Sequence, residues 1–107
     1  MGFFLYDKIL QSKIFCFLNK QYPCDTACNF DNVGLLIGDS EQEVTKALVS
    51  LDCTLQTIAE AEEKNCQLII THHPVIFSPL KNVLAGSIPF ELIKSGISVI
   101  SMHTNLD

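Results

Sequence analysis

The sequence has few basic side chains. Seven lysines and arginines stand against twelve aspartates and glutamates, which leaves a formal charge of −5 at pH 7. Proteins that bind nucleic acid directly need lysine and arginine to neutralise the phosphate backbone. The chain also lacks a glycine-rich loop ending in lysine, the usual cradle for a triphosphate. The charge balance therefore argues against direct nucleic-acid binding, and no motif for a nucleotide phosphate is present.

A long apolar run is missing from the start of the chain. The first twenty residues hold only two short apolar pieces, at 2–6 and 14–18, with charged and polar residues between them. A membrane-spanning helix needs about 20 apolar residues, and a secretory leader needs an apolar stretch of about 7–15. We therefore expect no membrane insertion and a cytoplasmic protein.

Paired cysteines are also missing. The five cysteines are an odd number and form no Cys-x-x-Cys motif; they are Cys16, Cys24, Cys28, Cys53 and Cys66. Cys24 and Cys28 could hold half of a zinc site, but no second pair lies nearby in the sequence. Most of the cysteines have apolar neighbours, as reduced cytosolic thiols that serve as small hydrophobic residues do. We expect them to be structural.

The composition is apolar for so small a protein. Hydrophobic residues make up 48% of the 107 residues, and the mean hydropathy is +0.28. Such a chain is long enough for one domain. Either its strands are buried on both faces, as in parallel sheets, or a large apolar surface is covered by a partner or by a second half. We expect both.

The apolar pattern predicts alternating helices and strands. Helical spacing runs through residues 3–20, and Thr54 and Ser87 are candidate caps for two later helices. Short apolar runs predict strands at 33–37, 47–51, 67–70 and 97–102. Strand, helix, strand, helix, strand with short connections is typical of consecutive βαβ units. The predicted fold class is α/β, with a mixed or mostly parallel sheet and flanking helices.

All three histidines follow apolar runs. His72 and His73 end one predicted strand, His103 ends the next, and Asp52 and Asp107 occupy comparable positions. In open α/β sheets, ligands and metals gather outside the carboxyl ends of the strands. The separations, 20 residues from Asp52 to His72 and 30 from His73 to His103, are close to βαβ repeats. We expect the five side chains to converge on one rim.

Imidazole and carboxylate together suit a transition metal: zinc, iron, manganese or nickel. Adjacent residues in extended chain point to opposite sides, so His72 and His73 would each serve one of two neighbouring ions. The alternative is that these histidines are ordinary hydrogen-bonded core or surface residues. Two histidines and Asp107, with His103 and Asp52 in reserve, supply about half of the donors that two ions need.

Four segments together resemble the NIF-three-like family, also called the GTP cyclohydrolase I type 2 family. In this sequence they read Asp-Asn-Val-Gly-Leu at 31–35, Ser-Leu-Asp-Cys-Thr at 50–54, Thr-His-His-Pro-Val-Ile-Phe at 71–77 and His-Thr-Asn-Leu-Asp at 103–107. Their order and spacing agree with the family over essentially the whole chain. The resemblance implies an α/β protein with two divalent metal ions that assembles as a toroidal homohexamer.

The resemblance also implies residue roles. His72, His73 and Asp107 match the family's first metal ligands, and His103 matches a histidine near the metals that could move protons. The implied reaction is the opening of the guanine imidazole ring of GTP by metal-activated water, with His103 as the catalytic proton shuttle. The alternatives are a non-catalytic metal-binding or protein-interaction module and an inactive fragment.

The chain departs from the family in its length. Family members are more than twice as long, and their remaining ligands, a histidine and a glutamate four residues apart, lie near the carboxyl terminus. We therefore expect residues 1–107 to be a single, truncated domain that lacks the family's carboxyl-terminal half, and we do not expect it to be active alone.

Overall fold

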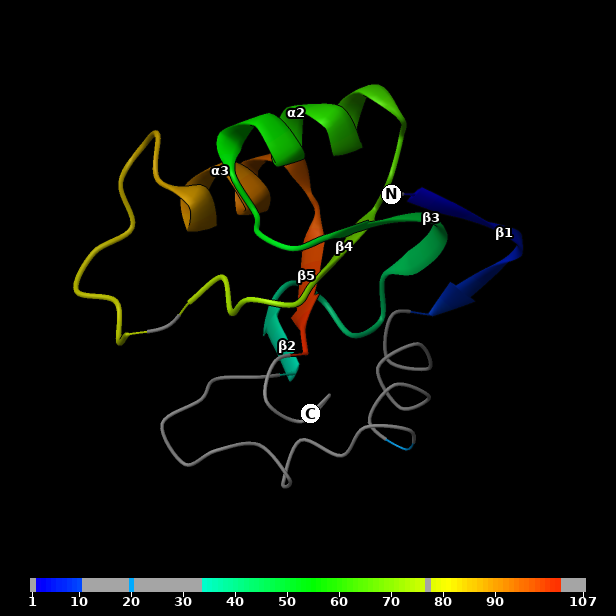
Figure 1. Cartoon of the computed structure of the whole chain (residues 1–107), viewed down its shortest axis with the longest axis horizontal. Helices are drawn as coiled ribbons and strands as arrows, with labels where there is room; N and C mark the ends of the chain where they lie inside the picture. Colours follow the sequence, from blue (N-terminus) through cyan, green and yellow to red (C-terminus); the bar gives the residue numbers. More distant parts are fainter. Residues whose placement is uncertain (1, 11–19, 21–33, 77, 103–107) are drawn as a thin grey trace.

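The computed structural model describes residues 2–10, 20, 34–76 and 78–102. In this part of the chain, five strands form one sheet and two helices connect the parallel strands (Figure 1). In chain order the elements are β1 (Gly2–Leu10), β2 (Gly34–Ile37), β3 (Glu43–Ser50), α2 (Leu55–Glu63), β4 (Leu68–Thr71), α3 (Ile88–Ser95) and β5 (Ser98–Ser101).

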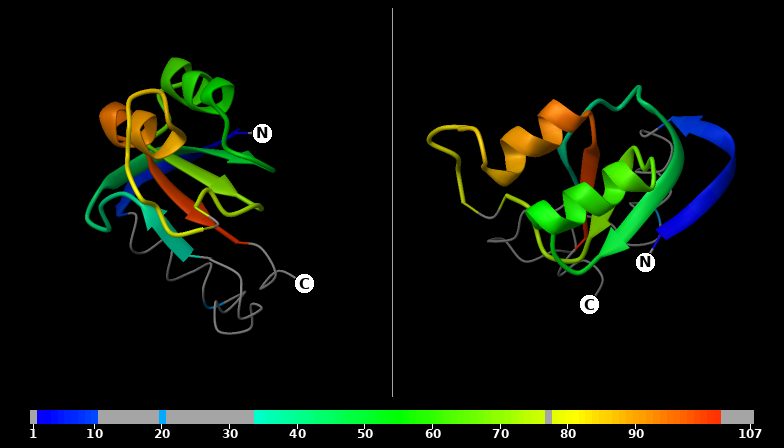
Figure 2. Two further views of the ribbon diagram at one scale, coloured as in Figure 1. Left: turned by 90° about the vertical axis from the view of Figure 1, so that its left-hand side faces the viewer. Right: turned by 90° about the horizontal axis from the view of Figure 1, so that it is seen from above.

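The sheet is mixed, with the strand order β1-β3-β4-β5-β2. The three central strands β3, β4 and β5 are parallel, whereas β1 and β2 are antiparallel edge strands. Helices α2 and α3 lie side by side on one face of the sheet (Figure 2). The predicted α/β class with βαβ units and flanking helices is therefore confirmed.

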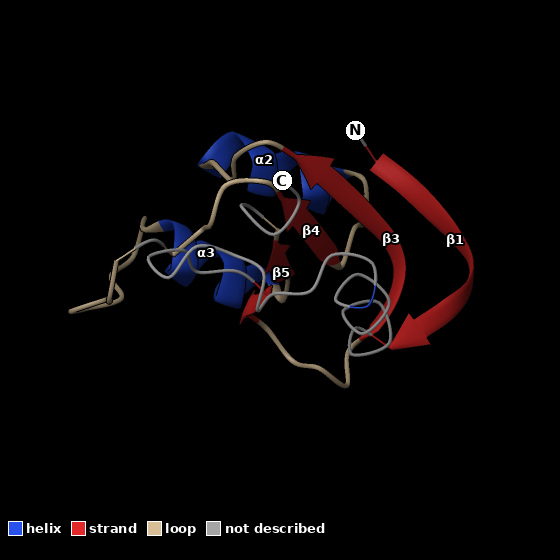
Figure 3. Ribbon diagram, turned by 60° about the horizontal axis from the view of Figure 1, so that its bottom comes forward, coloured by secondary structure: helices blue, strands red, loops and turns tan. Residues whose placement is uncertain are grey.

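The helix predicted over residues 3–20 is wrong for its first half. Gly2–Leu10 forms β1, which runs along the outer side of β3 (Figure 3). Phe3, Phe4 and Tyr6 are residue types that favour strands. The pairing with β3 shifts register between Phe4 and Ile9, so the sequence shows no strict alternation and its apolar spacing imitates a helix. The rest of the predicted helix, apart from Lys20, lies outside the described residues.

Both later helices begin at the caps that the sequence predicts. The Thr54 hydroxyl accepts a hydrogen bond from the Thr57 N–H and caps α2, and the Ser87 hydroxyl accepts one from the Phe90 N–H and caps α3. Helix α3 ends at Gly96, whose φ of 70° lies in the left-handed region that favours glycine. Each helix connects two neighbouring parallel strands, α2 between β3 and β4 and α3 between β4 and β5.

The central strands are buried on both faces. Leu48, Ile69 and Val99 are register neighbours in the cluster that contacts the helices. A second cluster, with Ala47, Leu68 and Ile100, contains the alternate positions of the same strands. The high apolar content is thus partly explained by two buried faces, as predicted. That a partner also covers apolar surface stays a prediction.

Neither described helix is long and apolar enough to cross a bilayer.

We predict that Ile69→Ala lowers the free energy of unfolding by about 2–5 kcal/mol, because a cavity opens in the middle of the sheet. Ile69 is 0% exposed on the central strand β4. Glu62→Ala is the control, since that side chain is exposed on α2, and it should change the free energy by less than about 0.5 kcal/mol. Urea denaturation of the two variants measures the difference, and equal stabilities would contradict this core.

Candidate metal centre

Polar side chains gather at the carboxyl ends of the parallel strands. Asp52 lies two residues after β3, His72 and His73 directly follow β4, and Met102 directly follows β5. Because the three strands are parallel and adjacent, these positions share one edge of the sheet. The predicted rim is therefore present for Asp52, His72 and His73.

Each histidine ring is held by an oxygen acceptor. His73 Nδ1 lies 2.6 Å from Asp52 Oδ1, and His72 Nδ1 lies 3.0 Å from the carbonyl oxygen of Met102. The two ring centroids are 5.3 Å apart. The predicted site residues His103 and Asp107 lie outside the described residues, but Met102, the residue before His103, contacts His72.

The expected opposite orientation of His72 and His73 is wrong. The His72 N–H donates to Ser50 O, at the end of β3, at 3.2 Å. The His73 N–H donates to Leu51 O, one residue further along, at 2.9 Å. Consecutive N–H groups of an extended strand point to opposite sides, so the chain has left the extended conformation here. This bend brings the rings together. Opposed side chains therefore do not assign His72 and His73 to two separate ions.

The site is accessible from solvent. The His73 side chain is 44% exposed and that of Asp52 is 57% exposed, whereas His72 is half-buried. A metal ion or a small molecule can therefore reach His73 without a rearrangement of the core.

A buried hydroxyl pair lies beneath the histidines. Thr71 Oγ1 and Ser101 Oγ are 2.7 Å apart and join β4 to β5 one residue before His72 and Met102. The Val75 N–H also donates to Ser101 Oγ, at 3.4 Å. This pair was not predicted from the sequence, although each residue is the polar carboxyl-terminal residue of its strand. The pair ties the loop after the histidines to β5.

The two histidines fit the pattern of metal ligands. Metal-ligating histidines usually donate their second ring N–H to a carbonyl or a carboxylate, which fixes the tautomer. The Nδ1 atoms of His72 and His73 have these two kinds of partner, so Nε2 would be the ligating atom in each ring. The described residues contain no group of three or more potential ligand side chains.

The two described cysteines pack among hydrophobic residues. Cys66 is buried in the core, and Cys53, next to Asp52, packs against the same cluster. Burial raises the pKa of the Cys53 thiol to about 11 and also raises that of Cys66. A raised pKa lowers the thiolate fraction at neutral pH, so both thiols are poor nucleophiles there. Cys16, Cys24 and Cys28 lie outside the described residues.

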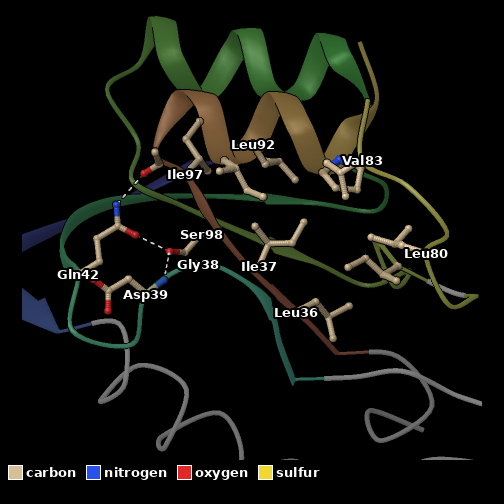
Figure 4. Close-up of a pocket in the computed structure, with 14 residues that line it drawn as sticks. Leu36, Ile37, Gly38, Asp39, Gln42, Leu80, Val83, Leu92, Ile97 and Ser98 are labelled. Atoms are coloured by element: carbon tan, nitrogen blue, oxygen red, sulfur yellow. Dashed lines mark hydrogen bonds between the residues drawn. The ribbon is translucent and has the colours of Figure 1, made fainter. Parts of the chain in front are cut away.

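An apolar groove of about 650 Å³ lies elsewhere on the molecule, between β2, α3 and the segment around residues 76–83 (Figure 4). One end is polar: Ser98 Oγ donates to Gln42 Oε1, and Gln42 Nε2 donates to Gly96 O at 2.7 Å. This end lies at the amino end of β5, opposite to the histidines. Its lining includes neither His72 nor His73, so the groove is not part of the candidate metal centre.

We predict that Ser101→Ala destabilises the fold by about 1–3 kcal/mol, because the buried Thr71 hydroxyl loses its partner. The double variant Thr71→Val, Ser101→Ala should be less destabilised than the sum of the two single variants. Thermal or urea unfolding of all four proteins measures this coupling. Strict additivity would show that the two hydroxyls do not stabilise the edge as a pair.

Similar proteins are found among bacterial sequences. A Staphylococcus aureus protein named GTP cyclohydrolase 1 type 2 homolog is 50% identical over 93 residues, which are 84% of this chain and 25% of that protein. A Clostridium acetobutylicum protein of the same name is 44% identical over 103 residues, 92% of this chain and 38% of that protein. The chain thus spans well under half of the length of these relatives.

Solved structures and the family comparison agree with the sequence matches. The crystal structure of a Staphylococcus aureus hypothetical protein superposes with a TM-score of 0.90 at 44% identity, covering 94% of this chain and 35% of that one. The family model described as Duf34/NIF3 (NGG1p interacting factor 3) matches residues 9–107. The resemblance noted from the four sequence segments is therefore confirmed, and the chain belongs to the Duf34/NIF3 family.

Proposed function

We propose that this chain supplies His72 and His73 to a divalent-metal centre, and that the centre serves hydrolysis of the GTP cyclohydrolase type. One observation carries the metal proposal: both Nδ1 atoms are held by oxygen acceptors, at 3.0 and 2.6 Å. Such acceptors present the Nε2 atom to an ion. The reaction type is supported by the name of the two relatives, GTP cyclohydrolase 1 type 2 homolog.

The ligand set combines two imidazoles with a carboxylate. His72 and His73 would bind through Nε2, and Asp107 is the third proposed ligand. Zinc, iron, manganese and nickel all accept this set. We propose two ions for the complete site, as the family resemblance implies, with the remaining donors coming from outside the described residues.

A bound divalent ion would supply Lewis-acid activation of water and polarise the substrate. The chain's own residues would do the rest. Asp52 and the Met102 carbonyl hold the two rings in place, and the exposed side of His73 leaves room for the substrate, which we propose to be GTP. His103, next to Met102, would carry the proton between water and the guanine ring as it opens.

We also propose a cytoplasmic homohexamer, as the resemblance implies. Several large apolar side chains are exposed in the described part of the chain, including Leu51, Leu84 and Ile93. Assembly would remove such surface from water.

A non-catalytic metal-binding module is the second candidate for this chain taken by itself. The observation that favours it is the pair of held imidazoles, which supports metal binding but carries no information about a substrate. A site that needs donors beyond His72, His73 and Asp107 would bind metal more weakly and would not turn over substrate.

We predict that the double variant His72→Ala, His73→Ala loses most of the metal that the wild-type chain retains, because both imidazole ligands are gone. Each protein is loaded with zinc or manganese and desalted, and the bound metal is measured by elemental analysis. Asp39→Asn is the matched control, since Asp39 is an acidic residue at the opposite edge of the sheet, and it should retain wild-type metal. Unchanged metal in the double variant would refute the ligand assignment.

The reaction is tested by incubating metal-loaded proteins with GTP and separating the products by chromatography. We expect the Staphylococcus aureus relative to open the guanine ring, and metal binding without turnover by this chain would favour the metal-binding module. If the metal-loaded relative leaves GTP unchanged, the cyclohydrolase proposal fails and the metal-binding module remains.

A further inference from the structure

Hydroxyl groups hold the turn that follows β3. The carbonyl oxygen of Asp52 accepts hydrogen bonds from Ser50 Oγ at 2.7 Å and from Thr57 Oγ1 at 3.3 Å. Thr57 Oγ1 is also 3.0 Å from the hydroxyl of Thr54, the N-cap of α2. The backbone of Asp52 is therefore fixed from both sides, by the end of β3 and by the first turn of α2.

His73 is attached to this turn at two points. Its N–H donates to Leu51 O at 2.9 Å, and its Nδ1 lies 2.6 Å from Asp52 Oδ1. An ionised carboxylate can only accept hydrogen bonds, so this contact requires a hydrogen on Nδ1. The turn thus determines both the position of the ring and its protonation pattern.

We propose that Asp52 is a positioning residue for His73. Its carboxylate accepts the Nδ1–H hydrogen bond and selects the tautomer in which Nε2 carries the lone pair for a divalent ion. The metal part of this inference rests on the proposed function, whereas the tautomer part does not. Asp52 thus acts through His73, and it is not itself a ligand.

The two histidines differ in the kind of acceptor that holds Nδ1: a backbone carbonyl for His72 and a side-chain carboxylate for His73. His72 Nδ1 is held by the backbone carbonyl of Met102, an acceptor that no substitution removes. His73 Nδ1 is held by a side chain that is 57% exposed and makes no contribution to the buried core. Asp52 can therefore be replaced without emptying a core position, and His72 serves as an internal reference in the same molecule.

The tautomer is read from long-range ¹H–¹⁵N spectra of the metal-free protein at about pH 8, where an ordinary imidazole is neutral. We expect His73 to be protonated at Nδ1 in the wild type and in Asp52→Asn, whose amide oxygen still accepts the hydrogen bond. In Asp52→Ala, His73 should shift to a mixture with the Nε2-protonated form, while His72 stays protonated at Nδ1. Asp39→Asn is the control and should match the wild type.

Zinc affinity, measured by competition with a chromophoric chelator, completes the test. We expect Asp52→Ala to bind zinc about 10–100-fold more weakly than the wild type, and Asp52→Asn to lose clearly less. An unchanged His73 tautomer in Asp52→Ala would overturn the inference. So would an equal loss in both variants, because a direct ligand fails with asparagine as with alanine. If the wild type binds no zinc, the proposed function fails, and the spectra still decide whether Asp52 sets the tautomer.

Discussion

The parallel pairing of β3, β4 and β5 is the constraint on which the candidate centre depends. The ladder sets Ser50 opposite Thr71 and Thr71 opposite Ser101, so the three strands end at one level. The residues that follow are Asp52, the histidine pair and Met102, and they make the contacts that hold the imidazole rings. A slip of one residue in this register would turn every side chain of a strand to the other face.

Packing on both faces keeps the register in place. Ile69 in the centre of the sheet belongs to the cluster under the helices, and its neighbour Leu68 belongs to the cluster on the other face. Both side chains are fully buried. A slip of one residue would push side chains that fit one face into the packing of the other face. The rigid part of the fold thus ends where the exposed, polar part of the centre begins, as is usual for sites carried on α/β sheets.

Local sequence signals predicted the features that depend on local chemistry. Thr54 and Ser87 cap the two helices, and the apolar runs mark the central strands. These signals were sufficient to predict that Asp52 and His73 lie at one edge of the sheet. The signal failed for Gly2–Leu10, where a register shift against β3 removes the alternation that identifies a strand. It also failed for the bend at His72 and His73, because the bend comes from bonds to the carbonyls of Ser50 and Leu51. Backbone acceptors such as Met102 O have no signature in the sequence.

The proposed function rests on a divalent ion bound at this sheet edge, beside His72 and His73. Titration of ¹⁵N-labelled protein with Mn²⁺, followed by ¹H–¹⁵N correlation spectra, tests it most directly, because a paramagnetic ion broadens the amide signals closest to it. The first signals to broaden should belong to residues around His72, His73 and Met102, while those of Asp39 and Gly96 at the opposite edge should stay sharp. Broadening that starts instead at the acidic face of α2, around Glu60 and Glu63, or nowhere, would contradict it.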